Sequence, residues 1–155
     1  MPRRAFTTVV ICSTLFSLAA CSSTTEPGAG GFRSSLSVTP QTTSVGGTVD
    51  AIWTIRNTSE HTIVRDFNPF GSQGYFLMIT TTDSTVLGNH GRDVEVIQGH
   101  TLTLAPHAKM TMTAHFDALA GGSAMVSGCL PPDSAQTDYT WNCITQTVTV
   151  RPPPT

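Results

Sequence analysis

The sequence has little charge and few of the residues that build long helices. Only 12% of its 155 residues are charged, with a single Lys and three Glu. A coiled coil or helical bundle would be rich in Ala, Glu, Lys, Leu and Arg, so both are excluded. An intrinsically disordered chain would combine low hydrophobicity with high net charge, which this chain lacks. The formal net charge of −2 provides no electrostatic footprint for a nucleic-acid partner.

No apolar run approaches the length of a membrane-spanning helix, but the first twenty residues have the pattern of an export signal. The positive segment Met1–Arg4 precedes residues 5–20, which are free of charge. Leu18-Ala19-Ala20-Cys21 matches a bacterial lipobox, which has a Leu, two small residues and a Cys. In the lipoproteins that this segment resembles, the Cys thiol receives a diacylglyceryl group, the peptide is cut before the Cys, and the new amino terminus is acylated.

We therefore expect residues 1–20 to be removed as a signal peptide and Cys21 to anchor the protein in a membrane through its lipid. The alternative is an ordinary secretory signal with an incidental Cys. A lipid anchor predicts a bacterial cell envelope protein. Ser22 stands where an Asp would indicate retention in the inner membrane, so the outer membrane is favoured, facing the periplasm or the cell surface.

Cysteine usage predicts one disulfide bond. Cys12 lies in the segment that is removed, and if Cys21 carries lipid, Cys129 and Cys143 are left as a pair in an oxidising compartment. Thirteen residues separate them, including Pro131 and Pro132, so we expect a loop between two antiparallel neighbouring strands. The bond should close the mouth of this loop, unlike the inter-sheet disulfide of antibody domains.

The remaining chain is typical of an all-β protein, because Ser and Thr make up 40 of the 155 residues and helical periodicity is lacking. Residues 21–33 are rich in Gly, Ser, Thr and Pro and predict a lipidated flexible tether, and residues 152–155 predict a Pro-rich tail. Between them, residues 34–151 contain seven to nine short β-type runs separated by turn residues. This pattern predicts a single immunoglobulin-like β-sandwich of antiparallel strands, with a small barrel as the alternative.

Two strands alternate clearly enough to assign their faces. Residues 48–56 and 109–116 each place every second residue on an apolar face. We expect a core that includes Val49, Ala51, Trp53 and Ile55 from the first strand, and Met110, Met112, Ala114 and Phe116 from the second.

Residues 49–116 resemble bacterial immunoglobulin/fibronectin-type envelope domains. The Asn-Thr turn of Ile55-Arg56-Asn57-Thr58 and the Leu-x-Leu-x-Pro element of Leu102–Pro106 are the motifs that carry this resemblance. The same stretch is similar to the domain of the Bacillus intracellular proteinase inhibitor, through Phe70-Gly71-Ser72-Gln73-Gly74-Tyr75-Phe76, Asp83 and Leu104-Ala105-Pro106. His107 stands where that family has Gly, and Val86-Leu87 where it has Trp. The resemblance implies an immunoglobulin-like fold, with proteinase inhibition as an alternative function.

The motifs of common active sites are missing. No Ser lies in G-x-S-x-G or S-x-x-K, and no Gly-rich loop precedes a helix, so we expect no enzyme and no cofactor. The five His do not have metal-ligand spacing. His107, Met110 and Met112 resemble soft copper ligands, but the two Met share the apolar face of a core strand. We therefore expect no metal site and keep a soft-metal carrier as a less favoured alternative.

Residues 68–74 form the best candidate binding surface, because Pro69 and two Gly lie there among the aromatic residues Phe67, Phe70, Tyr75 and Phe76. We select Phe70, Ser72, Gln73 and Tyr75 as candidate contact residues, although the aromatic rings could instead cover the end of the core. The sequence thus predicts a monomeric, lipid-anchored envelope lipoprotein with a non-catalytic binding or structural role. Its partner would be an unidentified envelope protein or glycan.

Overall fold

The computed structural model describes residues 23–27, 31–66, 75–89, 97–99, 101–130 and 142–154 of the chain. These residues form twelve strands, which are β1 (Ser23–Pro27), β2 (Phe32–Thr39), β3 (Thr42–Ser44), β4 (Thr48–Asn57), β5 (Ile63–Asp66), β6 (Tyr75–Thr81), β7 (Leu87–Asn89), β8 (Ile97–Gly99), β9 (Thr101–Leu104), β10 (Lys109–Ala118), β11 (Gly122–Leu130) and β12 (Asn142–Arg151).

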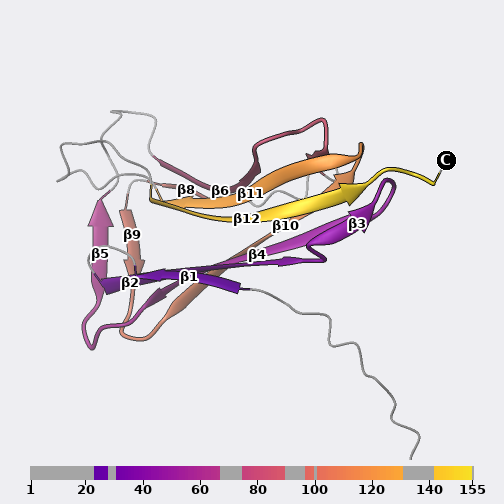
Figure 1. Cartoon of the computed structure of the whole chain (residues 1–155). Helices are drawn as coiled ribbons and strands as arrows, with labels where there is room; N and C mark the ends of the chain where they lie inside the picture. The colour runs from indigo at the N-terminus through magenta and orange to yellow at the C-terminus, as the bar shows by residue number, and fades with distance from the viewer. Residues whose placement is uncertain are drawn as a thin grey trace, which may run out of the picture.

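Two five-stranded sheets form the two layers of a sandwich (Figure 1). Sheet A has the strand order β1-β2-β4-β10-β7, and sheet B has the order β3-β12-β11-β6-β8. A third sheet of only two strands, β5 and β9, stands crosswise at one end of the layers (Figure 1). The pairings among the described strands are antiparallel, except that β3 runs parallel to β12. The predicted immunoglobulin-like sandwich is therefore confirmed.

The described residues form more strands than the seven to nine that the sequence pattern predicts. The additional strands are short edge segments, and β3, β7 and β8 have only three residues each. Such segments are too short to show alternation in the sequence. They become strands because a longer neighbour offers its free backbone groups for pairing.

The N-terminal boundary of the domain also differs from the predicted tether over residues 21–33. Residues 23–27 form β1, which pairs along its whole length with β2, and β2 itself begins at Phe32. Phe32 is only 2% exposed, because its ring belongs to the core. Ser and Thr indicate a flexible linker by composition, but they are also residues that strands accept, and here a neighbouring strand is available.

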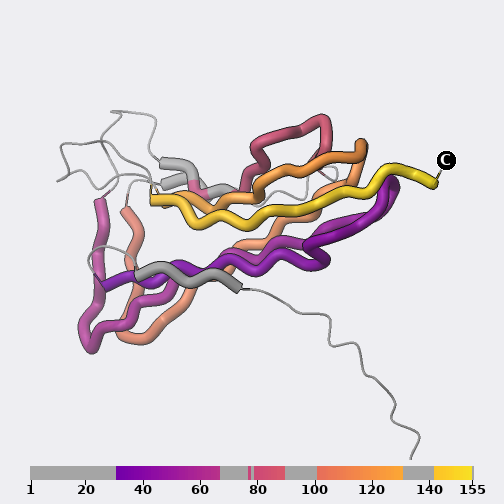
Figure 2. The backbone as a smooth tube through the Cα atoms, in the orientation of Figure 1, coloured from indigo at the N-terminus to yellow at the C-terminus, as the bar shows by residue number. Residues whose placement is uncertain are grey.

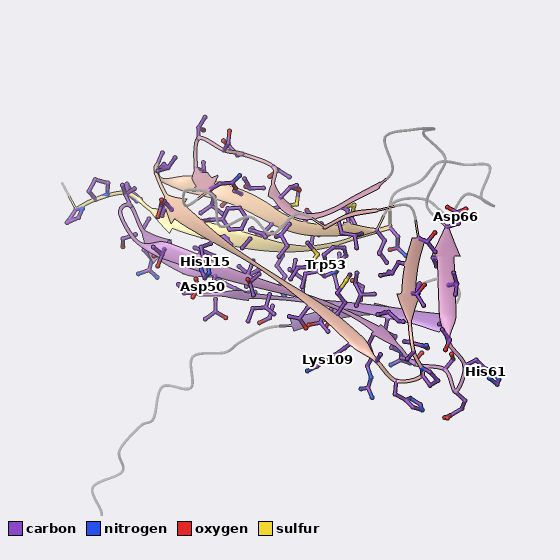
Figure 3. The ribbon with its side chains drawn as sticks, turned by 180° about the vertical axis from the view of Figure 1, so that it is seen from behind. Asp50, Trp53, His61, Asp66, Lys109 and His115 are labelled. Carbon is purple, nitrogen blue, oxygen red and sulfur yellow. A yellow bond between two sulfur atoms is a disulfide. The ribbon has the colours of Figure 1, made fainter. Side chains whose placement is uncertain are left out.

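The core follows the alternation of the two strands whose faces the sequence assigns. Val49, Ala51, Trp53 and Ile55 of β4 are at most 1% exposed, whereas Ile52 is 46% exposed. On β10, Met112, Ala114 and Phe116 are buried, and Met110 packs against the core. Trp53 lies between the two layers (Figure 3). The predicted inward faces are confirmed.

A buried Gln joins the two sheets where β2 lies beside β12. Gln146 of β12 is 5% exposed, and its Nε2 donates to the Leu36 carbonyl of β2 at 2.8 Å. Its Oε1 accepts from the Val38 backbone N–H at 3.2 Å and from Gln41 Nε2 at 3.2 Å. The Gln146 side chain therefore satisfies two buried backbone groups of β2, the Leu36 carbonyl and the Val38 N–H.

The chain leaves the sandwich at the end opposite the β5–β9 sheet (Figure 2). Residues 152–154 lie beyond β12, outside any strand and exposed. Among the residues that the structure describes, none belongs to a helix of the length and apolarity that crossing a bilayer requires.

Candidate functional site

The two cysteines left for pairing form a disulfide bond within sheet B. Cys129 of β11 and Cys143 of β12 are directly opposed, and their Cα atoms lie 4.1 Å apart. This separation is slightly below the usual range for disulfides and matches the close pairs of an antiparallel ladder. The bond joins hairpin ends and not the two sheets, as predicted. It therefore closes the connection from residue 131 to residue 141, which lies outside the described residues.

The candidate binding loop can be located only by the strands that flank it. Phe70, Ser72 and Gln73 lie outside the described residues, and of Tyr75 only the backbone is described, at the start of β6. β6 runs beside β11, with Met78 opposite Cys129, so it begins at the end of the sandwich that carries the disulfide. β6 therefore begins at the same end of the sandwich at which β11 ends.

The small β5–β9 sheet stands at this same end (Figure 1). Leu102 and Leu104 of β9 are buried, and Ile63 of β5 packs against the core. The guanidinium of Arg65 lies over the Phe32 ring, 5.6 Å from its centre. The sheet thus covers the apolar end of the sandwich and fixes where the connection to β6 starts, at Asp66.

Asn57 attaches the β5–β9 sheet to sheet A. Its side chain is fully buried, and its Nδ2 donates to the carbonyls of His61, Leu104 and Ala105 at 2.7–3.0 Å. Its Oδ1 accepts from both the backbone N–H and the hydroxyl of Ser59 at 2.8 Å. The Asn-Thr turn and the Leu-x-Leu-x-Pro element, on which the family resemblance depends, therefore meet in one hydrogen-bond network.

Two of the described histidines, His107 and His115, form simple surface contacts. His107 Nε2 lies 3.0 Å from Glu60 Oε2, and His115 Nδ1 lies 2.6 Å from Asp50 Oδ1, with all four side chains exposed. Figure 3 shows the His115–Asp50 pair beside the lower layer. Within the described ranges, no three His, Cys, Asp or Glu side chains are grouped as metal ligands would be. Met112 is buried in the core, as its position on the apolar face predicts.

A row of cations that no sequence pattern indicates lies on the outer face of sheet A. Arg33 of β2 is opposite Arg56 of β4, and Arg56 is opposite Lys109 of β10. The three side chains are exposed and border a hollow of about 370 Å³. Alternation along β4 could have shown that Arg56 points outward. The register that aligns the three strands cannot be read from the sequence.

Comparisons with known proteins show the fold alone. No protein-family model matches the chain, and neither does any curated protein. A crystal structure of Salmonella alpha-2-macroglobulin is similar over 80% of this chain and 7% of its own, with 16% identity and a TM-score of 0.51. A fragment of Escherichia coli alpha-2-macroglobulin, running from domain MG7 to the C-terminus, matches over 86% of this chain and 17% of its own, with 17% identity and a TM-score of 0.49. The chain thus spans a small part of the length of the proteins that it resembles. The similarity to the Salmonella structure agrees with the immunoglobulin-like sandwich that the strands of this chain form.

Proposed function

We propose that this chain is a lipid-anchored bacterial envelope lipoprotein whose immunoglobulin-like domain has a non-catalytic binding or structural role. The lipobox Leu18-Ala19-Ala20-Cys21 is the observation that carries this proposal. The disulfide between Cys129 and Cys143 supports it, because such bonds persist in oxidising compartments outside the cytoplasm. With those two paired and Cys12 in the signal segment, Cys21 is the one cysteine left for acylation.

The end of the sandwich that carries the disulfide is the part of the domain best suited to hold a partner. The Cys129–Cys143 bond fixes the base of one connection, and the β5–β9 sheet fixes the start of another. Binding surfaces are commonly presented by connections that leave a rigid sandwich at one end. Phe70, Ser72, Gln73 and Tyr75 remain the proposed contact residues, and an envelope protein or glycan the proposed partner.

Detergent partitioning tests the anchor, with Cys21→Ser as the variant and Cys12→Ser as its matched control. Both changes remove one thiol near the N-terminus, but only the first removes the proposed acylation site. Wild type and Cys12→Ser should enter the detergent phase, because two or three acyl chains anchor stably. Cys21→Ser should remain as uncleaved precursor or appear in the soluble fraction. A wild-type protein that stays wholly in the aqueous phase would end the lipoprotein proposal.

Proteinase inhibition is kept as the alternative, supported by the motif similarity around residues 70–76. An inhibitor of this kind would present the 68–74 loop to the protease, so Phe70→Ala should abolish inhibition in a protease assay. A binding module should show no inhibition before or after the change. It should instead retain a partner from envelope extract that the Phe70→Ala variant holds less well.

A further inference from the structure

Three cations stand in one row across neighbouring strands of sheet A. Arg33, Arg56 and Lys109 are direct cross-strand partners, and directly opposed side chains have their Cβ atoms about 4.5–5.5 Å apart. No described residue forms an ion pair or hydrogen bond with these three side chains. Like charges directly opposed on a sheet destabilise the fold. Repulsion within the row therefore lowers the stability of the fold, and a bound anion would offset this repulsion.

The surroundings of the row suit an anion that accepts several hydrogen bonds. The hollow beside it has a volume of about 370 Å³, near the lower end for small-ligand sites. Besides the three cations, its lining includes the hydroxyl-bearing residues Ser35 and Thr54, and no acidic side chain among the described residues belongs to it. Lys109 lies on the far side of this layer from Trp53, facing away from the core (Figure 3).

We propose that this hollow binds a phosphate group. Arg guanidinium groups present N–H donors in a planar fork that matches phosphate oxygens, and Lys adds a mobile ammonium. A phosphate monoester carries about −1.5 to −2 charges at neutral pH, which balances three cations better than a single carboxylate does. A long polyanion fits less well, because the whole chain has a formal net charge of −2 and the row contains only three cations.

The phosphate could belong to a soluble phosphate ester or to a lipid headgroup. β1 pairs with β2, and its first residue, Ser23, is opposite Ser37, four residues from Arg33. At about 3.3 Å per residue, the strand start lies about 13 Å along β2 from the row. A lipid on Cys21 would thus hold this face near a membrane. The site itself does not depend on the lipid anchor, so its test is separate from that of the proposed function.

The test uses the full chain carrying Cys21→Ser, so that acyl chains do not attach it to vesicles. In the first arm, titration calorimetry measures binding of inorganic phosphate and glycerol 3-phosphate. In the second, cosedimentation compares phosphatidylcholine vesicles with vesicles containing a share of phosphatidic acid, whose headgroup is a phosphate monoester. Arg56→Gln removes the central cation. Arg151→Gln, at the end of β12 in sheet B, is the matched control, because it removes one exposed cation outside the row.

A soluble ligand predicts calorimetric binding that Arg56→Gln weakens about tenfold or more, while Arg151→Gln changes it less than twofold. A lipid headgroup predicts the same variant pattern with phosphatidic acid vesicles and no binding of the soluble probes. Absence of binding in both arms, or equal losses in the two variants, would overturn the proposal. Melting curves check folding. Without ligand, Arg56→Gln should melt no lower than wild type, because it relieves repulsion. If the ligand is soluble, added phosphate should raise the melting temperatures of wild type and Arg151→Gln more than that of Arg56→Gln.

Discussion

Gly128 of sheet B lies directly against the indole ring of Trp53 of sheet A. A Cβ at position 128 would come within 2.6 Å of Trp53 Cγ and Cδ2, closer than side chains pack. In antibody domains, a disulfide between the corresponding layers holds the middle of the core. Here the disulfide lies within one sheet, and the contact between a large ring and a bare backbone joins the two layers. Ser34 Oγ accepts from Trp53 Nε1 at 2.5 Å and fixes the ring orientation.

Filling the space beside Trp53 should destabilise the domain. We expect Gly128→Ala to lower the free energy of unfolding by about 1–3 kcal/mol through overpacking, and Trp53→Ala to lower it by about 3–5 kcal/mol through the cavity left behind. Urea unfolding measures both. In a Trp53→Leu background, Gly128→Ala should lower the free energy of unfolding much less, because the indole ring is absent. Met125→Ala is the control, since this side chain of the same strand is 45% exposed. Strictly additive losses would contradict the contact.

Asn57 should matter for stability far more than a turn residue usually does. Asn57→Ala leaves the buried Leu104 carbonyl without its side-chain donor and breaks contacts to His61 and Ala105. Each buried group left unsatisfied costs about 1–3 kcal/mol, so we expect a loss of at least about 2 kcal/mol. Hydrogen exchange should show the greatest loss of protection in β5 and β9. Thr58→Ala, at the adjacent exposed position, is the control and should have a small effect. Equal exchange in both variants would refute this role.

Reduction of the Cys129–Cys143 bond should lower stability but leave the fold intact. The bond closes a segment with a sequence separation of 14 residues, for which chain entropy predicts about 3 kcal/mol. The Trp53 core does not depend on it, so far-ultraviolet circular dichroism of Cys129→Ser should match wild type while the melting temperature falls. Non-reducing mass spectrometry of the native protein provides the direct check. Two free thiols there would contradict the bond.

Asp83 should titrate below its ordinary pKa. The Thr85 hydroxyl at 2.6 Å, then the Thr85 backbone N–H at 2.8 Å, hydrogen-bond the Asp83 carboxylate and lower its pKa from the usual 3.8. The stabilisation is therefore complete at pH values above about 3.8, and it is lost as the pH falls through the lower pKa of the folded state. Thr85→Val should move the pKa of Asp83 up towards 3.8 in a carboxyl NMR titration. A wild-type value at or above 3.8 would contradict these hydrogen bonds.

The local pattern of the sequence predicts the parts of this fold that rest on alternation. The inward faces of β4 and β10 follow from their period of two. The pairing of Cys129 with Cys143 follows from cysteine usage, and its place at the hairpin ends follows from the turn residues between them. The short edge strands do not follow, because their pairing depends on a neighbour that is distant in the chain. β1 does not follow either, because it forms by pairing with β2 and because the composition of residues 23–27 favours a linker.

The cation row likewise cannot be predicted from local sequence. Arg33, Arg56 and Lys109 are far apart in the sequence, and only the register of three strands aligns them. No local motif contains that register, whereas the lipobox is complete within four adjacent residues. Asn57 lies between these cases. The sequence shows its turn but not the distant carbonyls that it binds.

The mass of the N-terminal peptide of the mature protein tests the central claim most directly. Protein extracted from membranes, digested and analysed by mass spectrometry should yield a first peptide that starts at Cys21. That peptide should carry a diacylglyceryl group on the thiol and an acyl chain on the amino terminus. An unmodified peptide starting at Cys21 or elsewhere, or a retained Met1, would contradict the account of this chain as a lipid-anchored envelope protein.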